Sequence, residues 1–151
     1  MPQGQAPERI EPRSLGDYLE QMTKSVFRSG MSWRVVDSKW PDIREAMSGF
    51  DTEAIANLSP AELDALTQDK RVIRNRRKLE AIVHNARRML DLEAKHGSFR
   101  GYLRSHEDFD ATIKDVRKQF KFMGDTGTYL FLYVVGEEVP SYEEWHTSRG
   151  G

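Results

Sequence analysis

Residues 74–95, RNRRKLEAIVHNARRMLDLEAK, contain the longest helical pattern in the chain. Apolar side chains recur there every three or four residues, at Leu79, Ile82, Val83, Ala86, Met89 and Leu90. This spacing places them along one side of an α-helix, and that side must be covered by other parts of the protein. Gly97 ends the pattern, because glycine readily adopts the left-handed backbone that follows a helix.

The segments on either side show the same periodicity in shorter runs. Helices are expected at about 15–28, at 32–40 and from Pro41 to 50, after Asp51, from Pro60, after Ser98, at 111–120 and at 128–135. The tail, 140–151, predicts one helical turn. Alternating strand periodicity is not found, so the sequence predicts an all-α fold. We expect one domain over 14–147, preceded by a flexible arm, MPQGQAPERIEPR, over 1–13.

Composition excludes several classes of site. The 151 residues include no cysteine, which rules out disulfides, thiolate zinc sites, cysteine nucleophiles and iron–sulfur clusters. The four histidines lack metal-binding spacing, so neither a metal nor a cofactor is expected. An apolar run long enough to span a membrane is missing, and the N-terminus has no apolar signal core. These features predict a cytoplasmic protein without a membrane partner.

Charge is segregated along a chain whose formal net charge is −1. Seven basic residues and one acidic residue lie within 71–88, whereas eight acidic and three basic residues lie within 37–70. The basic run Arg74, Arg76, Arg77 and Lys78 opens a helix, where cations oppose the helix dipole. Binding of phosphate would explain this placement. The alternative is a solvated face that forms ion pairs with the acidic segment.

A second candidate site is the turn FMGDTGT at 122–128. Glycine allows close approach of a ligand to the backbone, and the start of a following helix offers N–H groups to an anion. The residues concerned are Gly124, Asp125, Thr126, Gly127 and Thr128, with Lys118 and Lys121 beside them. The alternative is an ordinary connection between two helices.

Four blocks resemble the type I DNA-3-methyladenine glycosylases: GMSW at 30–33, VIRNRRKLEAIVHNAR at 72–87, GSF at 97–99 and FKFMG at 120–124. They occur in the family's order over about 18–136. The resemblance implies an all-α fold of the helix-hairpin-helix glycosylase superfamily. It also implies DNA binding through the hairpin and hydrolysis of the N-glycosidic bond of alkylated adenine.

The resemblance also suggests individual roles. The hairpin, 122–128, would hold a phosphate by its backbone N–H groups. Trp33 would line the pocket for the flipped base, where its alternative is a core tryptophan, and Met31 would be the wedge that fills the gap in the duplex. Tyr129 could reach this pocket, with core packing as the alternative.

Three features depart from the family. Ser25 stands where the family has a base-reading glutamate, and the family's zinc site cannot form without cysteine. The aspartate that the wider superfamily carries after the hairpin helix is also missing. Carboxylates near that point are Glu137, Glu138, Glu143 and Glu144, and the sequence does not select a general base among them.

The sequence therefore predicts a monomeric, nucleoid-associated DNA repair glycosylase. It would excise alkylated purines of the 3-methyladenine type from duplex DNA by base flipping and hydrolysis. One alternative is a DNA-binding module of the same fold without hydrolase activity. Another is a protein-interaction domain whose basic helix meets an acidic partner.

Overall fold

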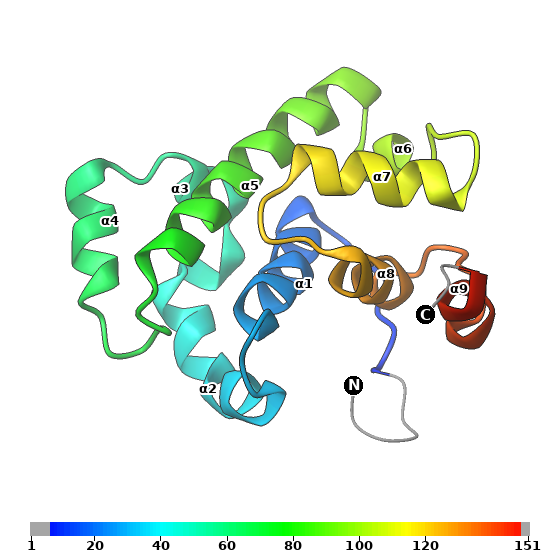
Figure 1. Cartoon of the computed structure of the whole chain (residues 1–151). Helices are drawn as coiled ribbons and strands as arrows, with labels where there is room; N and C mark the ends of the chain where they lie inside the picture. Colours follow the sequence, from blue (N-terminus) through cyan, green and yellow to red (C-terminus); the bar gives the residue numbers. More distant parts are fainter. Residues whose placement is uncertain (1–6, 149–151) are drawn as a thin grey trace.

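The computed structural model describes residues 7–148, and within that range all regular elements are helical. The all-α prediction is confirmed. Figure 1 shows the arrangement. The elements are α1 (Leu15–Arg28), α2 (Trp33–Ala46), the 3-10 helix η1 (Ser48–Phe50), α3 (Thr52–Ala56), α4 (Pro60–Thr67), α5 (Arg76–His96), α6 (Phe99–Leu103), α7 (Phe109–Gln119), α8 (Asp125–Val134) and α9 (Tyr142–Ser148).

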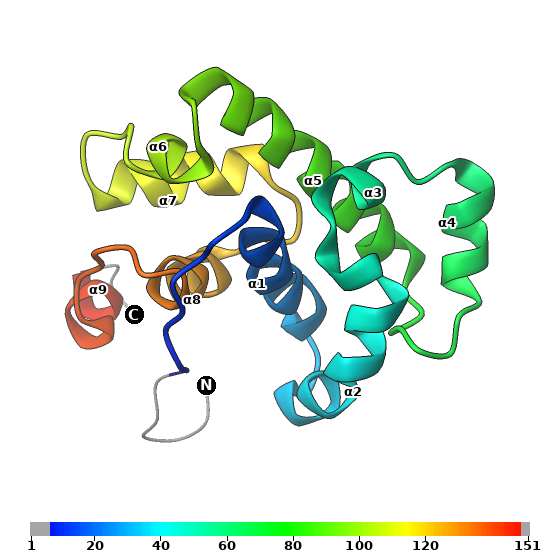
Figure 2. The same ribbon diagram turned by 180° about the vertical axis from the view of Figure 1, so that it is seen from behind.

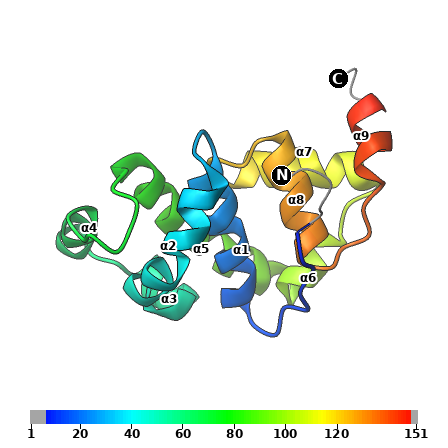
Figure 3. The same cartoon turned by 90° about the horizontal axis from the view of Figure 1, so that it is seen from below.

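Helix α1 lies at the centre of the molecule. It contacts α5 on one side and α8 on the other, as the view from below shows (Figure 3). Its side chains Leu19, Met22, Val26 and Phe27 are completely buried. Such an extensively buried helix fixes the relative positions of the two groups of helices beside it.

Helix α5 covers α1 with the apolar stripe expected from the sequence. Leu79, Ile82, Ala86 and Met89 are all fully buried. Asn75 begins the helix, because its side chain accepts a hydrogen bond from the Lys78 N–H, and Gly97 ends it with a φ of 82°. The helix therefore starts at Arg76, two residues after the beginning of the basic run.

Two predicted helix boundaries are wrong. The expected break at Pro41 does not occur, since α2 continues through it from Trp33 to Ala46. Proline removes only one backbone hydrogen-bond donor, and burial of Trp40 and Ile43 stabilises the helical turns on both sides of Pro41. The helix expected from Thr128 begins at Asp125 instead, so much of the glycine turn is helical.

The segment before α1 contacts α8, as seen from behind in Figure 2. The N–H of Ile10 donates to the Val134 carbonyl at 2.7 Å, and Arg9 donates to the carbonyls of Tyr133 and Glu137. The interpretation of 7–13 as a flexible arm is therefore corrected by these long-range contacts. Residues 1–6 of the predicted arm, and 149–151 of the tail, lie outside the described residues.

Candidate base-binding site

The turn between α1 and α2 presents Trp33. Gly30 adopts a φ of 73°, which turns the chain sharply after Arg28. Met31 and Trp33 follow, and both are partly buried against the core. Trp33 is the first residue of α2, so its ring is held at the junction of two helices.

The hairpin between α7 and α8 approaches the same place. Gly124 precedes α8 and has no side chain that could cap the N–H groups of the first turn. Such uncapped groups favour an anion. Thr128 is an exception, because its side chain is fully buried and its N–H donates to the Gly124 carbonyl. The prediction that Thr128 contacts phosphate is therefore wrong.

Backbone strain in this hairpin lies at Phe122. Its φ is 59°, a left-handed value that residues other than glycine rarely adopt. Its ring is large, hydrophobic and exposed. Gly124 has an extended conformation, with φ −79° and ψ −178°, and a Cβ there would meet nothing within 4 Å. The backbone itself therefore does not require glycine at position 124, although close approach of a ligand could.

Trp33 and the hairpin line one cavity of about 360 Å³. Its walls come from the end of α1, the start of α2, the hairpin and α8. The lining residues are Ser25, Arg28, Ser29, Trp33, Phe122, Gly124, Asp125, Thr126, Gly127 and Leu130. The structure thus brings Trp33 and Ser25 together with the hairpin, which follows them in the sequence by about ninety residues or more. We call this space the Trp33 cavity.

Polar groups in the Trp33 cavity are already engaged. The Ser25 hydroxyl donates to the Gly127 carbonyl at 3.3 Å and so links α1 to α8. Asp125 supplies the carboxylate among the lining residues, and Arg117 donates to it at 2.7 Å. The carboxylate at this cavity is therefore ion-paired with Arg117, and Ser25 contributes no charge.

Tyr129 lies outside the Trp33 cavity. It is buried, its ring stacks on Trp145 with a centroid distance of 4.7 Å, and its hydroxyl donates to the Pro140 carbonyl at 2.6 Å. It lines a separate cavity of about 240 Å³ with Arg9 and Tyr133. The interpretation of Tyr129 as part of the Trp33 pocket is corrected: this residue anchors the C-terminal segment instead.

The basic run divides into residues of different kinds. Arg74 and Arg77 are exposed, and so are Lys118 and Lys121 beside the hairpin. Arg76 forms ion pairs with Asp64 and Glu80. Of the basic residues predicted to contact phosphate in this run, Arg74 and Arg77 are thus accessible to a ligand at the surface.

Lys78 is only 4% exposed. Its ammonium donates to the carbonyls of Phe27 and Ser29, at 3.1 and 2.5 Å, and burial lowers its pKa. The predicted contact between Lys78 and DNA is therefore wrong. Lys78 holds the end of α1, next to the turn that carries Trp33.

Sequence reasoning missed Arg28, which lines the Trp33 cavity, and Asn85, which holds the chain just before the hairpin. Asn85 is 1% exposed, and its side-chain amide donates to the Lys121 carbonyl and accepts from the Lys121 N–H. A polar residue within the apolar stripe of α5 was the available signal. Arg28 was also missed, although its guanidinium covers the Trp33 ring with its carbon 4.5 Å from the ring centroid.

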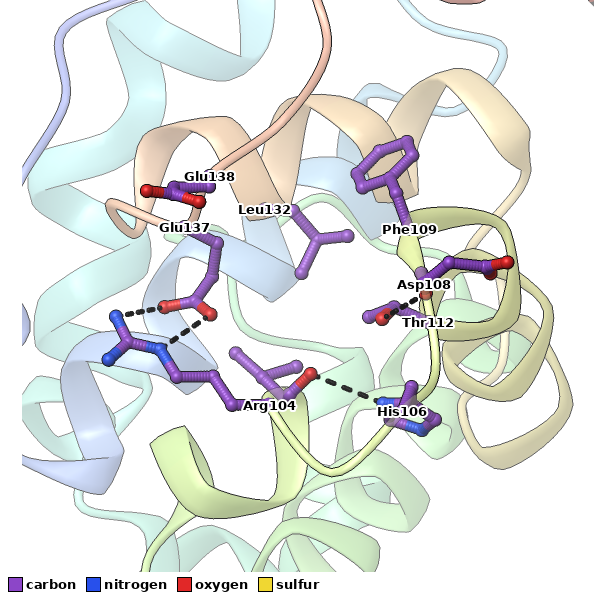
Figure 4. Close-up of a pocket in the computed structure, with 9 residues that line it drawn as sticks. Arg104, His106, Asp108, Phe109, Thr112, Leu132, Glu137 and Glu138 are labelled. Atoms are coloured by element: carbon purple, nitrogen blue, oxygen red, sulfur yellow. Dashed lines mark hydrogen bonds and ion pairs between the residues drawn. The ribbon is translucent and has the colours of Figure 1, made fainter.

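Carboxylates after α8 serve a different site. Glu137 is 8% exposed and pairs with Arg104 through both oxygens, at 3.1 and 3.2 Å. The pair lines another cavity, of about 420 Å³, drawn in Figure 4. A helix of ten residues is about 15 Å long, so α8 separates Glu137 from the hairpin at its opposite end. Glu137 is therefore not placed to act on a group bound at the hairpin end of α8.

The described residues include neither a metal-binding cluster nor a membrane-spanning helix. Over 7–148, no cluster of three or more histidine or carboxylate side chains could hold a metal ion. Within the same range, none of the helices is both long and apolar enough to cross a bilayer.

Known proteins are similar to this chain in sequence and in fold. It is 30% identical over 130 residues to the DNA-3-methyladenine glycosylase of Haemophilus influenzae, over 72% of this chain and 70% of that protein. The corresponding glycosylase 1 of Escherichia coli is 28% identical over the same shares. A structure of 3-methyladenine DNA glycosylase I from Staphylococcus aureus matches with a TM-score of 0.72, at 24% identity, over 84% of this chain and 79% of that one. The methyladenine glycosylase family model matches residues 16–119, so the chain belongs to this family.

Proposed function

We propose that this protein is a DNA repair glycosylase that flips an alkylated purine of the 3-methyladenine type into the Trp33 cavity and hydrolyses its N-glycosidic bond. The observation that carries the proposal is the convergence of Trp33, Ser25 and the hairpin on one cavity. Membership of the family supports the reaction class, and the relatives from Haemophilus influenzae and Escherichia coli are named for it.

The cavity supplies binding and charge. Purines alkylated at N3 or N7 carry a positive charge in DNA, and an indole face attracts a cation by about 0.5–2 kcal/mol. Asp125 adds a negative charge at the cavity and would stabilise both the cationic base and the charge that develops on the sugar. The glycosidic bond would then break with its electron pair going to the base, which leaves as a neutral molecule, and water would add to the cationic sugar carbon and lose one proton to solvent.

Duplex DNA would lie against the hairpin and the exposed basic residues. The uncapped first turn of α8 would hold one phosphate, and Arg74, Arg77, Lys118 and Lys121 would contact others. Met31 is placed at the turn before Trp33 and would fill the gap that the flipped base leaves. Each part comes from one chain, so we propose that residues 14–147 act as a monomer, at the nucleoid.

Release of free base from methylated duplex DNA tests the proposal. Purified protein should release 3-methyladenine, detected by chromatography, above the spontaneous rate. Trp33→Ala should remove most of this activity, because the stacking face is lost. Asp125→Asn should slow release more than Ser25→Ala, since only the first removes a charge from the cavity.

Binding without release would contradict the hydrolase proposal and favour a DNA-binding module. In that case the logarithm of the affinity for duplex DNA should still fall with the logarithm of the salt concentration, with a slope of about 0.9 per phosphate contacted. Arg77→Glu should flatten this slope, whereas Lys95→Glu, an exposed change at the far end of α5, should leave it unchanged. An unchanged slope in Arg77→Glu would show that Arg77 contacts no phosphate, and a wild type that does not bind DNA at all would favour a protein partner instead.

A further inference from the structure

The Trp33 ring is already covered by a cation. Arg28 lies in the last turn of α1, and its guanidinium carbon is 4.5 Å from the ring centroid of Trp33. Nη2 of Arg28 donates to Oδ1 of Asp37 at 2.5 Å. Asp37 follows Trp33 by four residues, so one face of α2 presents both the ring and the carboxylate. The guanidinium is thus held between two groups of the same helix.

This resting position leaves Arg28 incompletely bonded. Its side chain is 19% exposed, and its Nε is buried without a hydrogen-bond partner. A buried N–H without an acceptor is less favourable than the same group in water. Asp37, by contrast, is 51% exposed at its side chain. An outward shift of the guanidinium along Asp37 would expose Nε to water, which can accept the missing hydrogen bond.

We propose that Arg28 occupies the base site of the free protein as an internal competitor, and that a base stacks on Trp33 only after the guanidinium has left the ring. The inference rests on the proposed function, because it requires Trp33 to receive the base. The guanidinium, which lines the Trp33 cavity, and an alkylated purine bound there would use the same attraction to the indole face. They cannot occupy that face together.

Competition of this kind has a defined effect on affinity. The apparent affinity for any base falls by the fraction of protein in which the ring is uncovered. From the strength of a cation–indole contact, removing the guanidinium should tighten binding by about two- to thirty-fold. The factor should be similar for different bases, because Arg28 leaves the ring before any of them binds.

The test is a titration of free 3-methyladenine and free adenine into the wild type and Arg28→Met. Free bases carry no phosphate, so loss of a positive charge near DNA does not affect the result. Tryptophan fluorescence reports binding, and Trp33→Phe supplies the signal of the other tryptophans. Arg28→Met should bind both bases more tightly by a similar factor. Arg28→Lys keeps the cation and should remain closer to the wild type.

An unchanged or weaker affinity of folded Arg28→Met would overturn the inference. Quenching of Trp33 fluorescence by acrylamide gives a second measure that needs no base, and it should increase in Arg28→Met. If neither protein binds a base but quenching increases, the proposed function fails while the covering role of Arg28 stands. If the wild type releases base and Arg28→Met changes neither affinity nor quenching, the competitor role alone fails.

Discussion

The ammonium group of Lys78 lies at the C-terminal end of α1, where helix carbonyls lack partners within the helix. Two of these carbonyls, from Phe27 and Ser29, receive its hydrogen bonds. The sequence places Lys78 in a run of exposed arginines, but the helix turns it toward α1. Its contribution is therefore to the position of the turn that carries Trp33.

Lys78→Met should destabilise the fold by about 1–3 kcal/mol, because methionine retains the apolar stem but leaves the two carbonyls unpaired. Urea unfolding measures this change. The control is Lys114→Met, which is exposed on α7 and should change stability little. Wild-type stability in Lys78→Met, together with a loss of DNA affinity equal to that of Arg77→Met, would show that Lys78 contacts phosphate after all.

At the scale of elements, the side chain of Asn85 ties the chain at the start of the hairpin to α5. Asn85 pairs with both backbone polar groups of Lys121, at 3.1 and 2.8 Å. Lys121 directly precedes Phe122, whose left-handed backbone turns the chain toward α8. The amide of Asn85 therefore sets where the hairpin lies relative to the Trp33 cavity.

Asn85→Leu keeps a similar volume but removes both hydrogen bonds. We expect a loss of about 1–3 kcal/mol in the free energy of unfolding and faster hydrogen exchange at the Lys121 amide. Asn57→Leu is a suitable control, because Asn57 is exposed and water can replace its bond to the Glu53 carbonyl. Unchanged exchange at Lys121 in Asn85→Leu would mean that the hairpin is held by other contacts.

For the whole molecule, the link between α6 and α7 makes stability depend on pH. Asp115 accepts hydrogen bonds from the Tyr102 hydroxyl and from Nε2 of His106, both at 2.8 Å. Burial raises the pKa of the Asp115 carboxyl, but the hydrogen bonds from His106, Tyr102 and Gln119 outweigh it, so the pKa lies below its ordinary value. The folded state thus favours the ionised carboxylate.

A carboxyl whose pKa is lowered on folding stabilises the protein above its unfolded pKa of about 4, and this stability is lost as pH falls through the folded pKa. Asp115→Asn should therefore cost about 1–3 kcal/mol at neutral pH, and its difference from the wild type should shrink below about pH 4. Urea unfolding across this range measures the difference. Glu107→Gln, exposed nearby, is the control. A difference independent of pH would show that the Asp115 charge contributes nothing.

Local patterns in the sequence determined the helices and the residues of the family motifs. The stripe of α5, the capping box of Ser59 and Glu62, and the glycine after His96 are all formed by neighbours along the chain. The same patterns placed Trp33 and the hairpin among the candidate residues, and both line the cavity. These features depend on spacings of three or four residues, which the sequence displays directly.

Only the tertiary structure decided which way individual side chains face. Lys78 and Arg77 are neighbours in one basic run, yet packing of α5 on α1 buries the first and leaves the second exposed. Tyr129 turned toward Trp145, and Arg28 toward Trp33, through contacts between separate helices. The positions of these side chains follow from how whole helices pack on one another. Residue spacing within one helix does not show which other helix packs against it.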